Sequence, residues 1–388
     1  MSEIRAAVLH EAGAPLSVET VTLDPPRAGE VQVRVAAAGV CHSDVRLADG
    51  DLGDGRWPTI LGHEGAGVVE VVGPGVDSVM PGDRVAFCFV PPCRACTACS
   101  AGRFNLCETA MEHAWSGTML DGTTRLHLAD GRPMRHFNFV SCFAQRAVMP
   151  AASAVPIPAA LPLWQAALLG CAVVTGFGAV RNAARVGIGE SVCVIGCGGI
   201  GQQIVAAARM AGAGRIVAVD RDPTKLALAR ARGATDVVDA SDGDPLGGVL
   251  ALEPGGVDHA LEAVGNPATI RLAWDVLRPG ATAVVVGIAP RGAEVTLPAL
   301  ELLSEKGLRG SYYGSSNATV EIARLGQLMA DGRLEVTDAI SHLTDLDGIE
   351  DAFGRLRSGS GARTVAVIDA ALAGAPEQPT VAEVSGAV

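Results

Sequence analysis

Two different spacings of apolar residues divide the chain into an N-terminal and a central part. Up to about residue 150, short apolar runs interrupted by glycine and proline predict short strands. From about residue 171, apolar strands alternate with alanine-rich helices, which indicates repeated βαβ units and a parallel sheet. The expected strands are 31–39, 65–73, 83–90, 191–196, 215–220, 236–239, 257–265 and 282–287, and the expected helices are 200–211 and 224–232. The pattern therefore predicts a small, irregular β-rich domain followed by an α/β domain.

The C-terminal part follows neither spacing closely. A helix is expected near residues 320–330, and a strand is expected over residues 362–369, returning to the first domain. The final residues, 371–388, have no period, so we expect a mobile tail there. The longest apolar stretch, residues 159–180, is interrupted by proline, glutamine and glycines, which favours a buried helix and its approach over a membrane span.

Composition agrees with two domains and disfavours two classes of partner. A chain of 388 residues exceeds one ordinary core, and 48 glycines with only 4% aromatic residues suit an α/β protein. The net charge of −12 argues against nucleic acid and anionic membranes as partners. Glu3, Arg5 and Glu11 interrupt what would be the apolar core of an export signal. We therefore expect a cytoplasmic protein whose ten cysteines stay reduced and in which close cysteine spacing marks metal.

A glycine-rich turn follows the first strand of the α/β part. Gly196, Gly198 and Gly201 have the G-x-G-x-x-G spacing between an expected strand and an expected helix. Such a turn brings a dinucleotide pyrophosphate to the helix N-terminus. Asp220 ends the next strand, where a carboxylate would accept the ribose hydroxyls and repel the 2'-phosphate of NADP. The turn predicts a dinucleotide site that favours NAD over NADP, although Arg221 is adjacent to Asp220.

Four cysteines lie close together in the N-terminal part, in a C-x2-C-x2-C-x7-C array. They are Cys93, Cys96, Cys99 and Cys107. Four thiolates at such intervals can surround one zinc ion and leave no open position, which indicates a structural site. An iron–sulfur cluster is the alternative, but Glu108 stands where a ferredoxin-type array has proline.

A second reactive cluster, "GVCHSDVRLADG", covers residues 39–50. It places Cys41, Ser43 and Asp44 within four residues, where a thiol and a carboxylate seldom meet merely to pack. Candidate partners are the pair His63 and Glu64, and Cys171. A lone cysteine before a helix is usually a small buried hydrophobe, so the combination carries the prediction of a metal or proton path.

With these motifs, the chain resembles the zinc-dependent alcohol dehydrogenases of the medium-chain dehydrogenase/reductase superfamily, in their long-chain branch. The resemblance covers nearly the whole chain and includes the extended segment 117–145 and "RSGSGARTVAV" at 357–367. It implies a GroES-like, irregular β-rich catalytic domain and a Rossmann domain with a doubly wound parallel sheet. The implied boundaries are 1–172 for the catalytic domain, 173–312 for the NAD-binding domain, 313–370 for the return to the catalytic domain and 371–388 for the tail.

The resemblance also assigns roles to the reactive residues. It implies two zinc ions per chain, a structural one in the four-cysteine array and a catalytic one held by Cys41, His63 and Cys171, with the fourth position open to water or substrate. Glu64 would lie behind the metal as an occasional ligand, and Asp44 would brace the His63 imidazole. Ser43 would take the alcohol proton and pass it toward the nicotinamide ribose.

Further positions match contacts to coenzyme and substrate. Those matched to NAD are His42, Thr175, Gly196, Gly198, Gly199, Ile200, Gly201, Asp220, Lys225, Val286 and Arg363. Those matched to the substrate pocket are Leu52, Phe89, Phe137, Asn138, Ile288 and Tyr312. Each of the pocket residues could equally be ordinary core, and a surface salt bridge is the alternative for Arg363 and Lys225.

Two departures from the family pattern bear on function. Arg46 stands where many relatives have a proton-relaying histidine, and a guanidinium is no base near neutral pH. Residues 108–111 offer no cation for the carboxylate of a glutathione adduct. The resemblance, with these departures, implies reversible, NAD-linked oxidation of an alcohol to an aldehyde or ketone by a homodimer. A thiol-adduct aldehyde dehydrogenase of the same fold is the alternative enzyme, and a non-catalytic NAD-binding protein is the alternative of another class.

Overall fold

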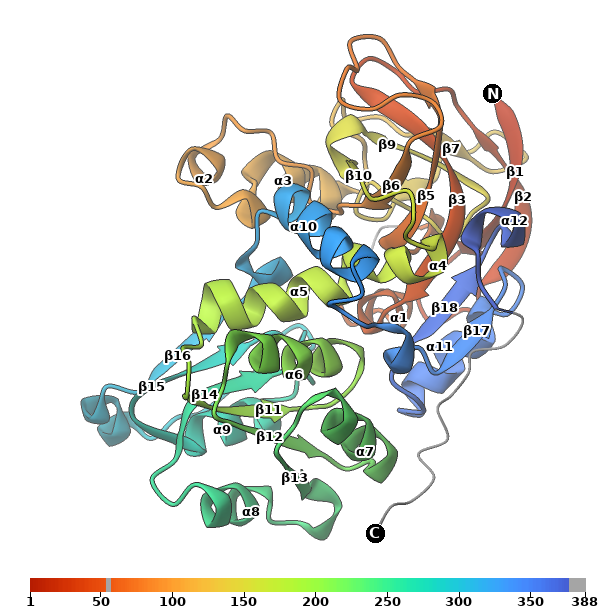
Figure 1. Ribbon diagram of the computed structural model, residues 1–388. Coiled ribbons are helices and arrows are strands. Elements are labelled where there is room, and N and C mark those ends of the chain that lie inside the picture. Colours follow the sequence, from red (N-terminus) through yellow and green to blue (C-terminus); the bar gives the residue numbers. More distant parts are fainter. Residues whose placement is uncertain (54–56, 377–388) are drawn as a thin grey trace. The chain divides into compact units, whose positions relative to one another are not determined.

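The computed structural model describes residues 1–53 and 57–376, which form two compact units. Of the described residues, unit 1 contains 1–174 and 317–376, and unit 2 contains Thr175–Ser316. The N-terminal strands and the last strand therefore belong to one unit, and the βαβ repeats to the other (Figure 1).

Unit 1 is built on two sheets of mostly antiparallel strands. The larger has the order β10-β6-β5-β3-β18-β17, with β9 also paired to β3, and the smaller has the order β7-β2-β1-β4-β8. The strands of the larger sheet are β3 (Glu30–Val40), β5 (Glu64–Val72), β6 (Arg84–Phe87), β9 (Arg146–Pro150), β10 (Ala154–Pro156), β17 (His342–Thr344) and β18 (Thr364–Val367). Those of the smaller sheet are β1 (Ser2–Leu9), β2 (Ser17–Leu23), β4 (Thr59–Ile60), β7 (Leu126–His127) and β8 (Arg135–His136).

The pairing register of the larger sheet brings together the strand ends that carry the candidate site. Strand β3 lies between β5 and β18 and is antiparallel to both, with Gly39 opposite Glu64 and Val40 opposite Thr364. A side chain at Gly39 would come within 2.5 Å of the Glu64 carboxylate, so only glycine leaves room for that group. The end of β3, the start of β5 and the start of β18 therefore meet at one place.

Short helices complete unit 1. They are α1 (His42–Ala48), α2 (Thr97–Ser100), α3 (Glu108–Ser116), α4 (Leu163–Ala166), α10 (Ala318–Ala330), α11 (Ile349–Arg357) and α12 (Ala370–Ala373). The expected mobile tail begins at residue 371, but Asp369 caps α12 and Ala373 is buried, so this turn is ordered. Residues 377–388 lie outside the described part of the chain.

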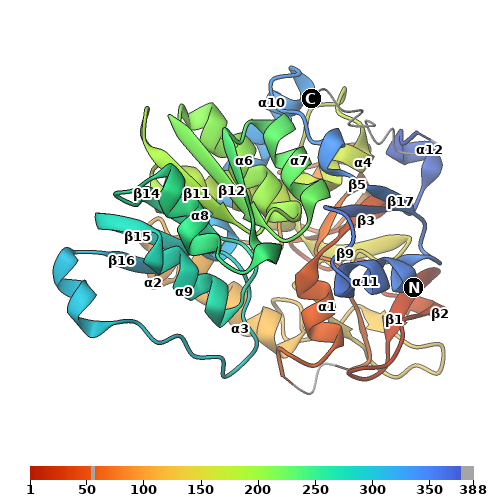
Figure 2. The same ribbon diagram turned by 90° about the horizontal axis from the view of Figure 1, so that it is seen from below.

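Unit 2 is a six-stranded parallel sheet of the order β13-β12-β11-β14-β15-β16, covered by helices on both faces (Figure 2). Its strands are β11 (Ser191–Ile195), β12 (Arg215–Asp220), β13 (Asp236–Asp239), β14 (Val257–Glu262), β15 (Leu277–Val285) and β16 (Gly307–Gly310). Its helices include α6 (Gly199–Ala211), α7 (Pro223–Arg232), α8 (Pro245–Leu252) and α9 (Pro267–Asp275). The Rossmann-type sheet and the β-rich domain predicted from the sequence are thus confirmed.

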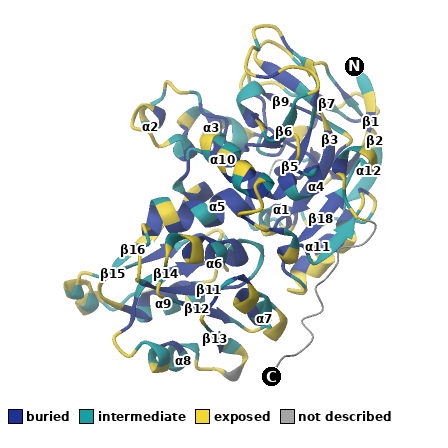
Figure 3. Ribbon diagram, viewed as in Figure 1, coloured by how far each residue is buried: buried dark blue, intermediate teal, exposed yellow. Residues whose placement is uncertain are grey.

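The strands of unit 2 are apolar on both sides because both sides are covered. One core joins side chains of α6 and α7 to the sheet, including Ile204, Val205 and Leu226, while the other joins α8 and α9, including Val249 and Ala273. Figure 3 shows the central strands as almost continuously buried ribbons. This burial explains the unbroken apolar runs that predicted a parallel sheet.

The apolar stretch near residue 170 is a series of short helical turns rather than one helix. Turns at Leu163–Ala166 and Ala167–Gly170 end at Cys171, whose φ of −140° and ψ of −73° interrupt the helical path before α5 (Ala172–Gly178) begins. No single helix of the described residues is long and apolar enough to cross a membrane, and one bent pair, Leu163–Gly170 with Ala172–Ala184, passes by length and composition only.

Candidate active site

Three residues that are far apart in the sequence meet inside unit 1. Cys41 follows β3, His63 precedes β5, and Cys171 stands before α5. One ligand atom from each lies within 4.8 Å of the other two, and all three residues are buried. The His63 Nε2 atom is 3.3 Å from the Cys171 Sγ atom. Among the described residues, no fourth histidine, cysteine or acidic side chain joins this group.

Asp44 fixes the geometry of this triad. Its Oδ2 atom accepts a hydrogen bond from the Cys41 backbone N–H at 3.1 Å, and its Oδ1 atom accepts one from the Gly62 backbone N–H at 3.0 Å. The same Oδ1 atom lies 3.2 Å from the His63 Nδ1 atom. A carboxylate at Nδ1 keeps the proton there, so Nε2 faces the two sulfur atoms as a ligand must.

The protonation of the triad shows how the thiols share charge. A hydrogen bond from the Cys171 thiol, helped by the Arg363 charge, holds the pKa of Cys41 well below its usual range despite burial. The same bond and burial raise the pKa of Cys171 well above its usual range. Burial acts to lower the pKa of His63, but Asp44 and the Cys41 thiolate together hold it well above the ordinary value.

This donor set fits a zinc ion. Two cysteines and one histidine, with the histidine oriented by a carboxylate, form a three-ligand site of the kind that leaves one position open. Because a metal binds thiolates, the proton that Cys171 shares with Cys41 would be released on binding.

Behind the triad lies a buried ion pair. The Arg363 Nη2 atom is 3.3 Å from the Glu64 Oε2 atom, an ion-pair distance without hydrogen-bond geometry, and Nη1 donates to the Val40 carbonyl at 2.9 Å. The other carboxylate oxygen of Glu64 accepts from the Ala172 backbone N–H at 2.9 Å. Burial raises the pKa of Glu64 to about 7 although Arg363 opposes this. Arg363 is thus a buried partner of Glu64 rather than a surface salt bridge.

Aromatic rings and a hydroxyl border the triad. Phe89 and Phe137 meet the His63 ring nearly at right angles, with ring centroids at 5.1 and 5.4 Å. Ser43 donates a hydrogen bond from Oγ to the Cys41 sulfur at 3.2 Å, and its Oγ atom is 3.3 Å from His63 Nε2. Two buried phenyl rings and one hydroxyl therefore surround the ligand atoms.

The remaining residues of the expected pocket are less closely gathered. Asn138 is half-buried and has a left-handed φ of 49°, and Leu52 is half-buried in unit 1. Ile288 and Tyr312 belong to unit 2, where their exposures are 43% and 38%. The structure thus brings Phe89 and Phe137 to the triad, whereas the other four pocket assignments stay predictions.

The four-cysteine array forms a second cluster in unit 1, with its four sulfur atoms within 4.8 Å of one another. Backbone N–H groups donate to these sulfurs, among them Cys96 N–H to Cys93 Sγ and Cys93 N–H to Cys107 Sγ, both at 3.3 Å. Such bonds, led by the one from Ala95, lower the pKa of Cys93 to about 6, while burial raises that of Cys99 to about 12. A closed set of four sulfurs with backbone donors fits a structural zinc ion.

In unit 2, the glycine turn lies between β11 and α6. Gly196 has a φ of 89°, and a side chain at Gly201 would come within 1.8 Å of the Gly196 carbonyl, so the helix can approach the turn only with glycine there. Asp220, at the end of β12, accepts a hydrogen bond from the Cys197 backbone N–H at 2.7 Å. The carboxylate is thereby held beside the turn, as a dinucleotide site requires.

The other positions matched to the coenzyme are distributed over both units. Thr175 and Val286 are buried in unit 2, and Lys225 lies in the first turn of α7 with its ammonium 3.9 Å from Asp222. His42 is exposed at the start of α1 in unit 1. Sequence reasoning did not find the bond from Ala172 to Glu64 or that from Cys197 to Asp220, because each joins residues whose separation in sequence gives no local signal.

Comparison with known proteins agrees with these sites. A family model described as "Alcohol dehydrogenase GroES-like domain" matches residues 27–159, and one described as "Zinc-binding dehydrogenase" matches residues 199–329. An S-(hydroxymethyl)glutathione dehydrogenase of Photobacterium damsela subsp. piscicida is 38% identical over 364 residues, which cover 93% of this chain and 98% of that protein.

Solved structures are similar over the same extent. A structure titled as an alcohol dehydrogenase zinc-binding domain protein from Burkholderia ambifaria matches with a TM-score of 0.90 and 36% identity over 95% of this chain and 99% of that chain. Benzyl alcohol dehydrogenase from Acinetobacter calcoaceticus matches with a TM-score of 0.89 and 30% identity over 95% of this chain and 100% of that chain.

Proposed function

Because the chain belongs to the zinc-dependent alcohol dehydrogenase family of the medium-chain dehydrogenase/reductase superfamily, and is thus an oxidoreductase, we propose that it interconverts an alcohol and its aldehyde or ketone with NAD and two zinc ions per chain. The observation that carries the proposal is the buried convergence of Cys41, His63 and Cys171, without a fourth ligand from the described residues. That set suits a metal that must also receive a substrate oxygen.

Cys41, His63 and Cys171 would hold one zinc ion, and the four-cysteine array the other. When bound, the first ion and NAD supply the Lewis acid and the hydride acceptor of the reaction. Asp44 keeps a proton on His63 Nδ1, so that Nε2 stays available as a ligand. Gly201 and Asp220 orient the coenzyme in unit 2. Gly201 lets helix α6 pack closely against the glycine turn, and the Asp220 carboxylate accepts hydrogen bonds from the ribose hydroxyls.

Proton transfer falls to Ser43. Its Oγ atom borders the ligand atoms of Cys41 and His63, so a substrate hydroxyl bound there can give its proton to Oγ. Arg46 does not continue this path, since its guanidinium pairs with Asp51 at 2.6 Å and a guanidinium group is not a proton acceptor in proteins. As Oγ accepts this proton, it would release its own hydroxyl proton to a neighbouring acceptor.

Phe89 and Phe137 indicate an apolar substrate. Rings perpendicular to the His63 ring present apolar walls beside the ligand atoms, which suit an aromatic or extended apolar alcohol better than a highly polar one. The similarity to the structure titled as benzyl alcohol dehydrogenase, which shares the fold, supports an aromatic alcohol as substrate.

A second candidate is favoured by the curated relatives, which are named S-(hydroxymethyl)glutathione dehydrogenase. Residues 108–111 on α3 supply no cation for a glutathione carboxylate, which argues against that substrate. NADH formation decides between the two: benzyl alcohol and aliphatic alcohols should be oxidised without added thiol, and a zinc chelator should abolish turnover. Turnover of formaldehyde only in the presence of glutathione would support the second candidate, and chelator-resistant turnover would contradict both.

A further inference from the structure

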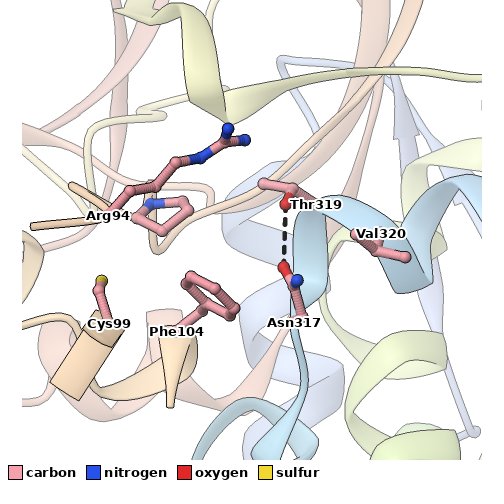
Figure 4. Close-up of a pocket in the computed structure, with 7 residues that line it drawn as sticks. Arg94, Cys99, Phe104, Asn317, Thr319 and Val320 are labelled. Atoms are coloured by element: carbon pink, nitrogen blue, oxygen red, sulfur yellow. Dashed lines mark hydrogen bonds between the residues drawn. The ribbon is translucent and has the colours of Figure 1, made fainter. Parts of the chain in front are cut away.

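A cavity of about 370 Å³ lies in unit 1 between the four-cysteine array and the N-terminus of α10. Pro92, Arg94, Cys99 and Phe104 line it from the array and the segment around it, and Asn317, Thr319 and Val320 line it from α10 and its cap (Figure 4). Its size falls at the lower end of ligand pockets, so an occupant would be a small molecule. The cavity shares no residue with the Cys41, His63 and Cys171 triad or with the glycine turn.

Arg94 gives the cavity a positive charge. Figure 4 draws its extended side chain among the residues that line the cavity. Within residues 1–53 and 57–376, no acidic side chain lies within the 4.0 Å of an ion pair from its guanidinium. Arg94 is exposed, so its guanidinium is open to solvent and to a dissolved anion, in a protein whose net charge is −12. The backbone φ of Arg94 is 60°, a value that glycine would adopt more readily. The backbone therefore does not favour arginine at this position, and the reason for an arginine lies in its side chain.

The α10 side of the cavity adds hydrogen-bond donors. Thr319 donates from Oγ1 to Asn317 Oδ1 at 3.0 Å, which leaves the Asn317 amide NH₂ as a donor. Asn317 is the N-cap residue of this 13-residue helix but forms no side-chain cap bond, so its amide is not used to close the helix end. The positive end of the helix dipole acts in the same direction as the arginine charge.

The other lining side chains are apolar except that of Cys99, whose sulfur belongs to the four-cysteine array. Pro92, Phe104 and Val320 contribute a pyrrolidine ring, a phenyl ring and an isopropyl group. A guanidinium and an amide on an apolar background recognise an anionic group attached to an apolar body. We infer that this cavity binds a small organic carboxylate with an aromatic or branched apolar body, at a site separate from the candidate active site.

Benzoate is a suitable probe, with acetate and benzamide as matched controls that lack the ring and the charge. Calorimetric titration of the zinc-loaded, full-length protein should show benzoate binding more tightly than either control. Arg94→Gly should weaken this binding at least about tenfold, because it removes a charge-assisted pair, and Arg94→Lys should restore part of it. Glycine accepts the φ of 60° readily, so Arg94→Gly should fold and retain its zinc.

Arg103→Ala is the matched control variant, because it removes an exposed arginine that lies between Cys99 and Cys107 but does not line the cavity. It should leave benzoate binding within about twofold of the wild type. Binding of benzoate at the catalytic metal would be equal in the wild type and Arg94→Gly, and that equality would overturn the inference. Equal affinities for benzoate and benzamide, or for benzoate and acetate, would overturn it as well.

Discussion

At the scale of single residues, Asp44 connects the three segments that form the candidate active site. Its carboxylate accepts one hydrogen bond from the Cys41 backbone N–H after β3 and one from the Gly62 backbone N–H before β5, and it orients the His63 ring. The sequence predicted its role from its place beside Cys41 and from the family resemblance. The pairing of Glu64 with Arg363 was not predicted, because the two residues meet only through the strand pairing of β3 with β5 and β18.

Ser43 and Arg46 provide a test of the proton path. Ser43→Ala should lower kcat for alcohol oxidation by about 100-fold, because it removes the hydroxyl beside the ligand atoms. Arg46→Ala should change kcat by less than about threefold, because this arginine is engaged with Asp51. Steady-state kinetics with zinc content measured for each variant check this. Equal losses in both variants would contradict the assignment.

His136 should make stability depend on pH. It is 2% exposed, its Nε2 atom accepts from the Arg125 backbone N–H, and burial lowers its pKa to about 3 from an ordinary 6.5, with the Arg125 charge contributing. Between these values the unfolded chain binds a proton and the folded protein does not, so stability is lost as pH falls below about 6.5. The loss between pH 7 and pH 5 should be about 2 kcal/mol.

Urea unfolding of the wild type and His136→Gln at both pH values measures this dependence. Glutamine can place an acceptor near the former Nε2 position and does not titrate, so the variant should lose about 2 kcal/mol less than the wild type between the two pH values. His10→Gln, at a histidine whose side chain is 43% exposed, is the control and should follow the wild type. Parallel curves for the wild type and His136→Gln would refute the role of His136.

At the scale of elements, the sequence predicted best what repeats locally. The apolar runs and alanine-rich segments of unit 2 became β11 to β15 with α6 and α7, because period and burial agree there. The two-residue strands β4, β7 and β8 have no such period and exist only through pairing with distant segments. The helical path broken at Cys171 was missed for a similar reason, since the surroundings of the triad determine that backbone.

The four-cysteine array is an element whose order should depend on metal. Cys99→Ser removes one of four sulfurs, so the zinc content should fall from about two to about one per chain and the thermal midpoint should decrease. Cys193→Ser is the control, because this buried cysteine of β11 lies outside both clusters; it should lose stability but keep about two zinc ions. Atomic emission and calorimetry measure both quantities, and an unchanged zinc content in Cys99→Ser would exclude a metal role for the array.

At the scale of the whole molecule, the sequence predicted two kinds of domain because the apolar spacing differs between the two parts. The chain length of 388 residues also indicated more than one hydrophobic core. The sharing of unit 1 between the N-terminal part and the chain after Asn317 depends on β18 pairing with β3, which the sequence only suggested through its last apolar strand.

We expect a homodimer, and unit 2 offers a surface for its contact. Strand β16 is an edge of the parallel sheet, and an edge strand presents unpaired backbone groups to a second chain. Leu300 and Leu303, just before it, are 79% and 81% exposed, and Leu308 within it is 36% exposed. Apolar side chains gathered beside an open strand edge fit a twofold contact in which two β16 strands pair antiparallel.

Leu303→Glu should therefore convert the dimer into a monomer, because it places a charge on each side of the twofold contact. Ile188→Glu is the matched control, since this residue is 91% exposed in the same unit but outside the β16 edge, and it should remain dimeric. Size-exclusion chromatography with light scattering at micromolar concentration gives the mass of each. The triad lies wholly in unit 1, so both variants should retain their zinc. A dimeric Leu303→Glu, or a monomeric wild type, would show that the β16 edge is not the contact.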